Sequence, residues 1–164
     1  MSKPTDFDLV SRRPLTHRRR IGWSDTDAAR ITYTVRFFEF AMAGIEAWFR
    51  EIWGEDWFDM NTRQARGTPF VRVETDILSP VVPGDILDVQ VMVERLGTSS
   101  ITFQVYGHKA SDGEPVLKGR YVCVLVRLES GMTATPIPVE KRERVMNYIS
   151  ECNKCMKNSS VGSS

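Results

Sequence analysis

One long apolar segment, residues 35–53, constrains the fold of this chain more than any other feature. The segment is too long for a strand, and its Ala, Met, Glu and Arg residues favour a helix. Four polar residues form a single narrow stripe along that helix: Arg36, Glu39, Glu46 and Arg50. A surface helix has a narrow apolar stripe instead, so this helix is predicted to be buried on most sides. Its charges argue against a membrane span.

The downstream sequence supplies a sheet that covers such a helix. Apolar and polar residues alternate, with the period of strands, over residues 71–77, 87–94, 101–105 and 116–128. Turn signals separate these runs, including Pro83-Gly84-Asp85 and Asp112-Gly113. A further strand is expected to end near Trp23. The pattern predicts the α+β class, with a five-stranded antiparallel meander wrapped around the long central helix.

Length and charge limit the organisation and the partners of the protein. The 164 residues are sufficient for one domain with a sizeable core. We expect that domain to span residues 14–150, with flexible tails at 1–13 and 151–164 and a short helix at 139–150. The net charge of +1 gives no electrostatic case for a nucleic acid or an anionic membrane as partner. No apolar signal core begins the chain, which predicts a cytoplasmic location.

Two carboxylates precede the long helix and are the main chemical candidates. Asp25 and Asp27 lack the spacing of a calcium loop. One interpretation is routine capping of the helix, because a turn carboxylate accepts hydrogen bonds from free backbone N–H groups. The other is that one carboxylate acts as a nucleophile or activates water, while the free N–H groups of the helix bind a developing oxyanion.

Other catalytic and metal-binding patterns are missing from the sequence. Cys152 and Cys155 form a C-x-x-C pair without a second pair, so no metal site is predicted. Cys123 lies within a strand and is interpreted as a core residue. No serine stands in a G-x-S-x-G motif. The two histidines, His17 and His108, lie outside the acidic turn.

The order of these elements and several short motifs resemble a known family. The segment from Trp23 to Tyr33, followed by Phe37-Phe38-Glu39-Phe40, is similar to the signature of 4-hydroxybenzoyl-CoA thioesterases and related acyl-CoA thioesterases. The turns at residues 67–71, 83–85 and 97–100 also fit this family. The resemblance extends from about residue 16 to residue 128. It implies a hotdog fold and hydrolysis of a CoA thioester to the free acid and CoA.

The resemblance also implies roles for individual residues. Asp27 takes the catalytic position, as nucleophile or general base, and the backbone N–H of Thr34 or of Tyr33 points at the thioester oxygen. Asp25 then holds the turn. Arg30 stands where many relatives have glycine and is expected to contact the substrate.

The remaining substrate contacts and the assembly follow from the same resemblance. Phe37 and Phe38 are expected to line an acyl pocket, which leaves an aromatic acyl group open. In this fold the site forms between protomers of a homodimer or homotetramer. Three residues are therefore expected to reach the substrate from the partner chain: Gly67, Thr68 and Ser99. CoA is part of the substrate, and no separate cofactor is expected.

Two alternatives remain open at this point. A hotdog dehydratase would use a histidine with an acidic partner, and the histidines of this chain are poorly placed for that. A non-catalytic protein that binds an acyl group or CoA would need no carboxylate at the thioester. The presence of a carboxylate at Asp27 therefore distinguishes the enzyme hypothesis from the hypothesis of a binding protein.

Overall fold

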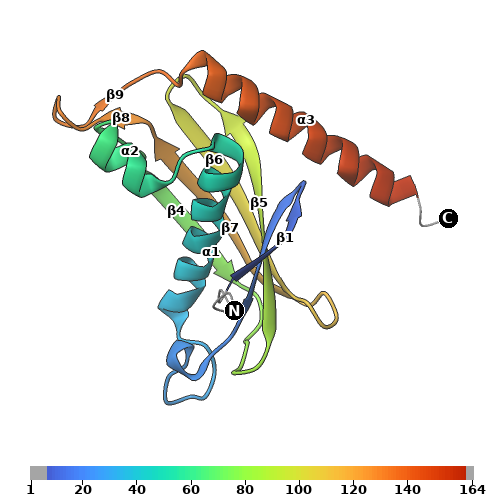
Figure 1. Cartoon of the computed structure of the whole chain (residues 1–164). Helices are drawn as coiled ribbons and strands as arrows, with labels where there is room; N and C mark the ends of the chain where they lie inside the picture. The colour runs from blue at the N-terminus through green and yellow to red at the C-terminus, as the bar shows by residue number, and fades with distance from the viewer. Residues whose placement is uncertain (1–6, 162–164) are drawn as a thin grey trace, which may run out of the picture.

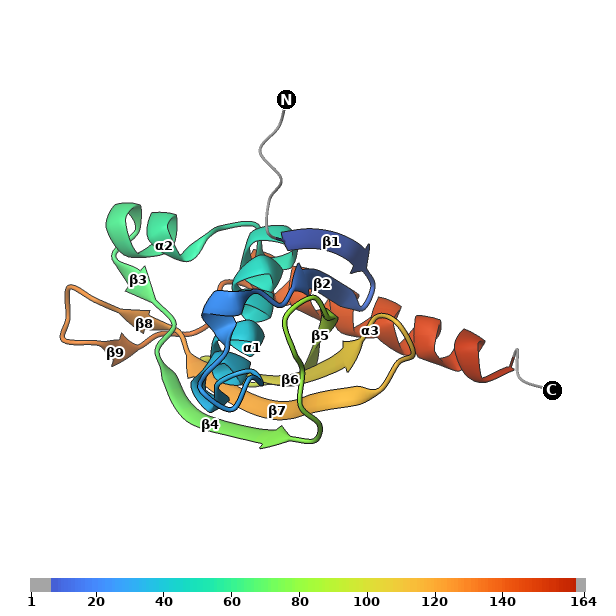
Figure 2. The same ribbon diagram turned by 90° about the horizontal axis from the view of Figure 1, so that it is seen from below.

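A central helix organises the computed structural model, which describes residues 7–161. Helix α1 (Thr34–Trp48) continues into a short π-helical stretch, η2 (Phe49–Trp53), so the predicted helix at 35–53 is confirmed. Gly54 ends the segment in a left-handed conformation, with φ of 86°. Figure 1 shows α1 crossing the sheet, and Figure 2 shows the sheet curving around it.

The main sheet is antiparallel and has six strands in the order β1-β2-β5-β6-β7-β4. Their bounds are β1 (Phe7–Arg12), β2 (Leu15–Arg20), β4 (Phe70–Ile77), β5 (Ile86–Leu96), β6 (Ser100–Lys109) and β7 (Pro115–Val124). A small second sheet joins β3 (Arg66–Gly67), β8 (Val126–Arg127) and β9 (Thr133–Ala134). The sheet around one helix confirms the expected hotdog arrangement, with one strand more than the five predicted.

Three expectations about the elements are wrong. Residues 7–12 of the expected tail form β1, because their backbone pairs with β2 across a bulge. The C-terminal helix α3 (Val139–Val161) continues through most of the second expected tail. Strand β4 does not lead the meander but pairs with β7, at the opposite edge from β1. Residues 1–6 and 162–164 of the expected tails lie outside the described residues.

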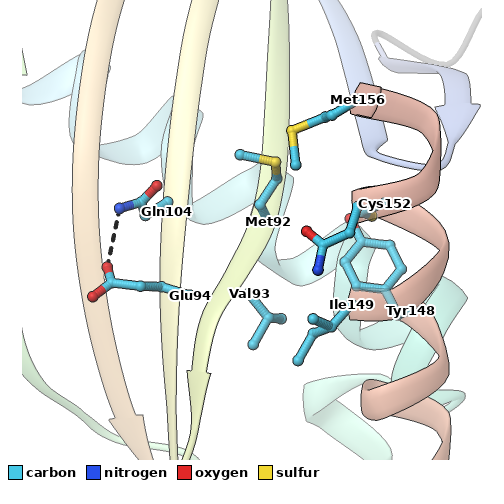
Figure 3. A pocket seen from close by; sticks show the side chains of 9 residues that line it. Met92, Val93, Glu94, Gln104, Tyr148, Ile149, Cys152 and Met156 are labelled. Carbon is cyan, nitrogen blue, oxygen red and sulfur yellow. Dashed lines mark hydrogen bonds between the residues drawn. The ribbon is translucent and has the colours of Figure 1, made fainter. Parts of the chain in front are cut away.

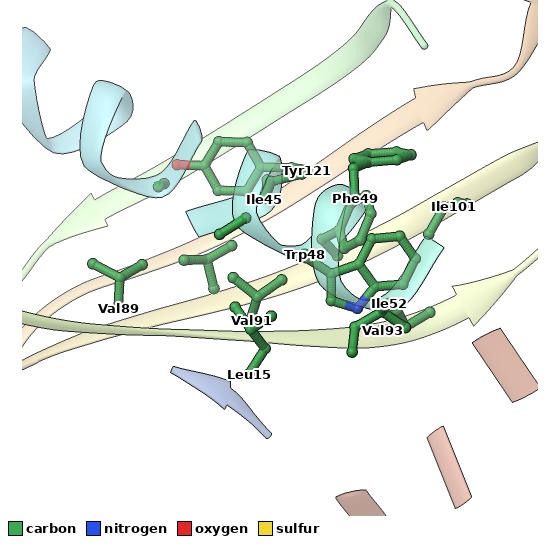
Figure 4. Close-up of a cluster of buried hydrophobic side chains, with 14 of the residues drawn as sticks. Leu15, Ile45, Trp48, Phe49, Ile52, Val89, Val91, Val93, Ile101 and Tyr121 are labelled. Carbon is green, nitrogen blue, oxygen red and sulfur yellow. The ribbon is translucent and has the colours of Figure 1, made fainter. Parts of the chain in front are cut away.

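The core lies between α1 and the strands β5 and β6. The predicted alternation of β5 is confirmed, since Val89 and Val91 are fully buried against the helix. Gly44 permits the close approach, because a Cβ at this position would lie 2.9 Å from a methyl group of Val89. Figure 4 shows Trp48 and Ile45 of α1 packed over these valines.

The two remaining helices flank this core. Helix α2 (Trp57–Arg63) begins at Asp56, whose carboxylate accepts the Asp59 N–H at 2.8 Å. Helix α3 runs beside β5. Tyr148 joins α3 to the core, because its ring packs edge-on against the ring of Trp48 with the two ring centroids 5.9 Å apart. Over residues 7–161, the helices lack the combined length and apolar character that spanning a membrane requires.

Candidate active site

The acidic turn between β2 and α1 is built around a buried carboxylate. Asp25 closes the short helix η1 (Trp23–Asp25) and is only 4% exposed. One oxygen of its carboxylate, Oδ2, accepts hydrogen bonds from the Gly22 N–H and from Nη2 of Arg19, both at 2.9 Å. The Nε atom of Arg36 lies 3.6 Å from its Oδ1. A carboxylate held on these sides supports the turn, which agrees with the role that the family resemblance implied for Asp25.

Asp27, by contrast, is exposed at the tip of the turn. Its Oδ1 accepts the Ala29 N–H at 2.8 Å, and its backbone N–H donates to the Ile31 carbonyl at 3.2 Å. The Arg30 N–H donates to the Asp27 carbonyl at 3.0 Å, and Arg30 has a positive φ of 63°. Arg30 therefore adopts the left-handed backbone that glycine favours, with its side chain exposed. The turn fixes the Asp27 backbone and leaves its carboxylate accessible.

The start of α1 carries the two backbone N–H groups that are candidates for an oxyanion donor, and one of the two is already used within the protein. The Tyr33 N–H donates to the Asp25 carbonyl at 2.9 Å and is therefore engaged within the turn, which leaves the Thr34 N–H as the candidate donor. The Arg36 N–H donates to the Tyr33 carbonyl at 2.9 Å. Thr34 and Val35 are then the first helical residues whose N–H groups have no acceptor within the helix.

A polar cleft of about 490 Å³ adjoins Asp27 and the first turn of α1. It is lined by Ser24, Thr26, Asp27, Tyr33, Val35, Arg36 and Glu39. Arg36 donates from Nη2 to the Ser24 carbonyl at 3.1 Å and also bonds to the Glu39 carboxylate. Arg36 thus ties the helix to the acidic turn. The sequence placed it only in a polar stripe, because a contact across 12 residues has no local signal.

An apolar cleft of about 330 Å³ lies beside the same helix start. It is lined by Ile31, Thr32, Thr34, Phe37, Ile77, Leu78, Ser79 and Pro80. Phe37, one of the two aromatic residues expected in an acyl pocket, lies here. Phe38 does not line this cleft, because its ring stacks on Tyr121 with the centroids 6.2 Å apart.

The three residues expected from a partner chain lie at the other end of the sheet. Strand β4 begins at Phe70 beside Cys123 of β7 and ends at Ile77 beside Leu117. Gly67 and Thr68 line a third cleft of about 330 Å³, with Met42, Trp57, Asn61, Pro69, Phe70, Leu128 and Met132. The Ser99 carbonyl accepts the Leu125 N–H at 2.7 Å, also at this end. Within one chain these residues therefore do not meet Asp27.

Two further groups of reactive side chains within residues 7–161 lie apart from the acidic turn. Burial raises the pKa of the Cys123 thiol to about 12, so this thiol stays protonated. His108 lies 4.0 Å from the Asp88 carboxylate, but Arg18 already binds that carboxylate through two hydrogen bonds. Asp88 stands between two residues that face the core, so it points away from α1. His108 and Asp88 therefore do not form the histidine and acid pair of a dehydratase beside the acidic turn.

The C-x-x-C pair is separated within α3. Cys152 is buried and Cys155 is exposed. Figure 3 shows Cys152 and Tyr148 on the side of α3 that faces Met92 of β5, in a small cleft away from the acidic turn. Among residues 7–161, no three histidine, cysteine or carboxylate side chains gather in a way that would hold a metal ion.

Comparisons with known proteins agree with this geometry. The sequence pattern of the thioesterase-like superfamily matches residues 21–146. A thioesterase superfamily protein from Jannaschia sp. CCS1 is 36% identical, with a TM-score of 0.74 over 82% of this chain and 92% of that chain. A search of curated proteins gives no significant match.

Two more distant structures share the fold at 17% identity. One is a 1,4-dihydroxy-2-naphthoyl-CoA thioesterase from Synechocystis, with a TM-score of 0.72 over 84% of this chain and 96% of that chain. The other is a 4-hydroxybenzoyl-CoA thioesterase in which an aspartate is replaced by asparagine, complexed with 4-hydroxybenzoyl-CoA. Its TM-score is 0.74 over 81% of this chain and 99% of that chain. The chain therefore belongs to the thioesterase-like superfamily and has the hotdog fold.

Proposed function

We propose that the protein hydrolyses an acyl-CoA thioester to the free acid and CoA. One observation carries this proposal: the accessible carboxylate of Asp27 and the first turn of α1 line the same cleft. The carboxylate supplies a nucleophile or a general base. The helix start supplies N–H donors and the positive end of the helix dipole. Acyl transfer requires this combination.

The reaction follows from these groups. The thioester oxygen accepts a hydrogen bond from the Thr34 N–H, which stabilises the negative charge that develops on it. Asp27 attacks the carbonyl carbon, or it removes a proton from a water molecule that attacks instead. The carbon–sulfur bond breaks, and the CoA thiolate leaves and takes up a proton. Attack by water gives the free acid directly, whereas attack by Asp27 gives a mixed anhydride that a water molecule then hydrolyses to the free acid and the Asp27 carboxylate. The proposed chemistry uses no cofactor besides the CoA of the substrate.

We further propose that the working site needs a second copy of the chain. Strand β4 is an edge strand with exposed apolar side chains at Val71, Val73 and Ile77. If the β4 strands of two copies pair in antiparallel orientation, the Phe70 end of β4 in one copy lies beside the Ile77 end of β4 in the other copy. Gly67 and Thr68 of one copy then approach the Ile77 end, where the other copy carries its acidic turn. This supports a homodimer, or a tetramer built from dimers.

The test is release of free thiol from a panel of CoA thioesters, with Asp27→Asn beside the wild type. The substitution keeps the side-chain acceptor for the Ala29 N–H and removes the negative charge. We expect kcat to fall at least ~100-fold, the scale for loss of an acid–base or nucleophilic group. Unchanged turnover in a folded Asp27→Asn protein would contradict the proposal.

Asp112→Asn is the matched control. Its carboxylate accepts the N–H two residues ahead, at Glu114, at 2.9 Å, as Asp27 does at Ala29. Asp112 lies in the β6–β7 hairpin and does not line the cleft. Its substitution is expected to leave kcat unchanged. A folded wild-type protein that hydrolyses no thioester would favour a non-catalytic protein that binds acyl-CoA.

A further inference from the structure

We propose that the apolar cleft between residues 31–37 and 77–80 holds the acyl group of the substrate, and that this group is uncharged, apolar and of medium size. The proposal rests on the thioesterase function proposed above. It goes further because it assigns the two sides of the helix start to different parts of one substrate, and because it states which acyl groups fit.

The position of the apolar cleft connects it to the reacting atoms. Thr34, whose N–H is the proposed oxyanion donor, lines the apolar cleft, while its neighbours Tyr33 and Val35 line the polar cleft. The turn that carries Asp27 adjoins both, since Asp27 bonds through its backbone to Ile31 of the apolar cleft. A thioester carbon beside Thr34 therefore has an apolar space on one side and a polar, charged space on the other.

The walls of the apolar cleft offer hydrocarbon rather than hydrogen bonds. Its eight lining residues include no charged side chain. Two of its three hydroxyl groups already donate within the protein, from Thr32 to the Val81 carbonyl at 3.0 Å and from Ser79 to the Pro115 carbonyl at 2.7 Å. A carboxylate or an amide on the acyl group would lose its water without gaining partners, which is costly. An apolar group gains from the same burial.

The size of the cleft favours a short or medium acyl chain over a long one. Its volume of about 330 Å³ is at the lower end of the ~300–1,000 Å³ that ligand pockets span. Phe37 closes its inner side and is 3% exposed. The segment opposite is fixed at both ends, because the Leu78 N–H donates to the Val116 carbonyl at 2.8 Å and the Thr32 N–H to the Val81 carbonyl at 2.9 Å. One aromatic ring or a chain of medium length fits such a space.

The polar cleft then takes the thiol side of the substrate. It presents the Arg36 guanidinium and the Glu39 carboxylate, both near the surface. The part of CoA next to the thioester carries amides, which such groups can hydrogen-bond. The substrate thus crosses the start of α1, with its acyl group toward Ile77 and its CoA toward Glu39.

A chain-length series with a variant that fills the cleft tests this assignment. Leu78 is 55% exposed at the cleft, and Leu78→Trp adds bulk there. We expect the ratio of kcat/KM for octanoyl-CoA over acetyl-CoA to fall at least ~10-fold in Leu78→Trp, because single methylenes in a pocket change this ratio on that scale. Wild type should prefer octanoyl- and benzoyl-CoA to palmitoyl-CoA and to the charged succinyl-CoA.

Val82→Trp is the control, because Val82 is similarly exposed at 42%, belongs to the same connecting segment and does not line the cleft. The octanoyl-to-acetyl ratio should stay at the wild-type value in this variant. An equal loss on both substrates in Leu78→Trp, or a wild-type preference for succinyl-CoA, would overturn the acyl assignment while the thioesterase function stands.

A binding measurement distinguishes failure of the proposed thioesterase function from failure of the proposed acyl pocket. Titration calorimetry of the Asp27→Asn variant with octanoyl-CoA and with CoA measures the acyl contribution to affinity without turnover. Tighter binding of octanoyl-CoA that is lost when Leu78→Trp is added to this variant would support the pocket even if no thioester is hydrolysed by the wild type. Equal affinity for octanoyl-CoA and CoA would reject the pocket.

Discussion

The backbone N–H of Tyr33 donates a 2.9 Å hydrogen bond to the carbonyl oxygen of Asp25. This bond occupies the N–H group just before α1 and leaves the next one, that of Thr34, as the proposed donor to a substrate. It also links the two ends of the acidic turn, whose carboxylate at Asp25 is buried. The buried aspartate thus holds the frame from which the exposed aspartate, Asp27, is presented.

Asp25→Asn is expected to reduce stability more than chemistry. The substitution keeps an acceptor for the Gly22 N–H but leaves the mostly buried charge of Arg19 without its carboxylate partner. Removing one member of a buried ion pair costs about 3 kcal/mol of unfolding free energy. Urea unfolding measures this loss. Asp27→Asn, at an exposed position, should change the same free energy by less than ~0.5 kcal/mol, and equal losses in the two variants would contradict these roles.

Arg30→Gly is expected to stabilise the folded protein. Arg30 has a left-handed backbone, which costs a non-glycine residue ~1–2 kcal/mol, so glycine removes this cost. Glycine also gives the unfolded chain more conformational freedom, which lowers the stability of the folded state by ~0.4–1 kcal/mol. The net gain in unfolding free energy is about 0.5–1 kcal/mol. Arg30→Val should destabilise instead, because a branched side chain tolerates this backbone poorly. If Arg30 also contacts the substrate, both variants will raise KM irrespective of their stability.

Tyr148→Phe tests the attachment of α3. The Tyr148 hydroxyl accepts the Leu15 N–H at 2.9 Å and donates to the Val91 carbonyl, so its removal leaves two buried backbone groups unpaired. Each such group costs roughly 1–3 kcal/mol, and thermal unfolding should begin at a clearly lower temperature. Tyr106→Phe is the control, because the Tyr106 hydroxyl donates to the Gln104 side chain and not to a backbone group. A Tyr148→Phe protein as stable as this control would show that the bridge contributes little.

Stability is expected to decrease in acid through Glu55. Burial opposes ionisation of this carboxyl, but hydrogen bonds from Gln64 and Lys141 outweigh it and lower its pKa. A carboxyl whose pKa is lower in the folded state stabilises the protein above its ordinary pKa of about 4.5, and the contribution disappears as the pH falls through the lowered value. Urea midpoints between pH 6 and pH 3 should fall less steeply for Glu55→Gln than for wild type. Parallel curves would refute this contribution.

Val73→Lys tests the proposed pairing of β4. A lysine on an edge strand discourages pairing with another strand, so the variant should sediment as a monomer where the wild type sediments as a dimer or tetramer. Activity should fall with dissociation if Gly67 and Thr68 act from the partner. Val139→Lys, at an exposed position on α3, is expected to keep the wild-type assembly. A wild type that sediments as a monomer and is fully active would contradict the two-copy site.

Much of the fold was predictable because periodicity is local. The length of the apolar segment predicted the helix from residue 35 to residue 53, and strict alternation predicted β5 and β6. Strand β1 was missed because Leu9 and Val10 are adjacent rather than alternating, and because the strand is recognised only through its pairing with β2. The position of β4 beside β7 depends on a connection that crosses the start of α1, which no local pattern specifies.

The site was predictable as far as its residues are close in sequence. Asp25, Asp27 and Thr34 lie within one short stretch, and the difference between a structural and an exposed carboxylate followed from the family resemblance. The use of the Tyr33 N–H within the turn depends on backbone geometry. The walls of the apolar cleft from Ile77 to Pro80 belong to another part of the chain, so only the folded structure brings them to the helix start.

The hydroxyl of Tyr148 lies where β2 begins, at Leu15, and where β5 continues beyond its pairing with β2, so a side chain from helix α3 completes the pairing of an early strand. The hairpin of β1 and β2 and the helix α3 are therefore expected to open as one cooperative unit, although most of the chain separates them in sequence. Detachment of α3 would release the Leu15 amide to exchange with solvent. Opening of the β1–β2 hairpin and opening of α3 would then be coupled, at the edge of the sheet opposite to β4.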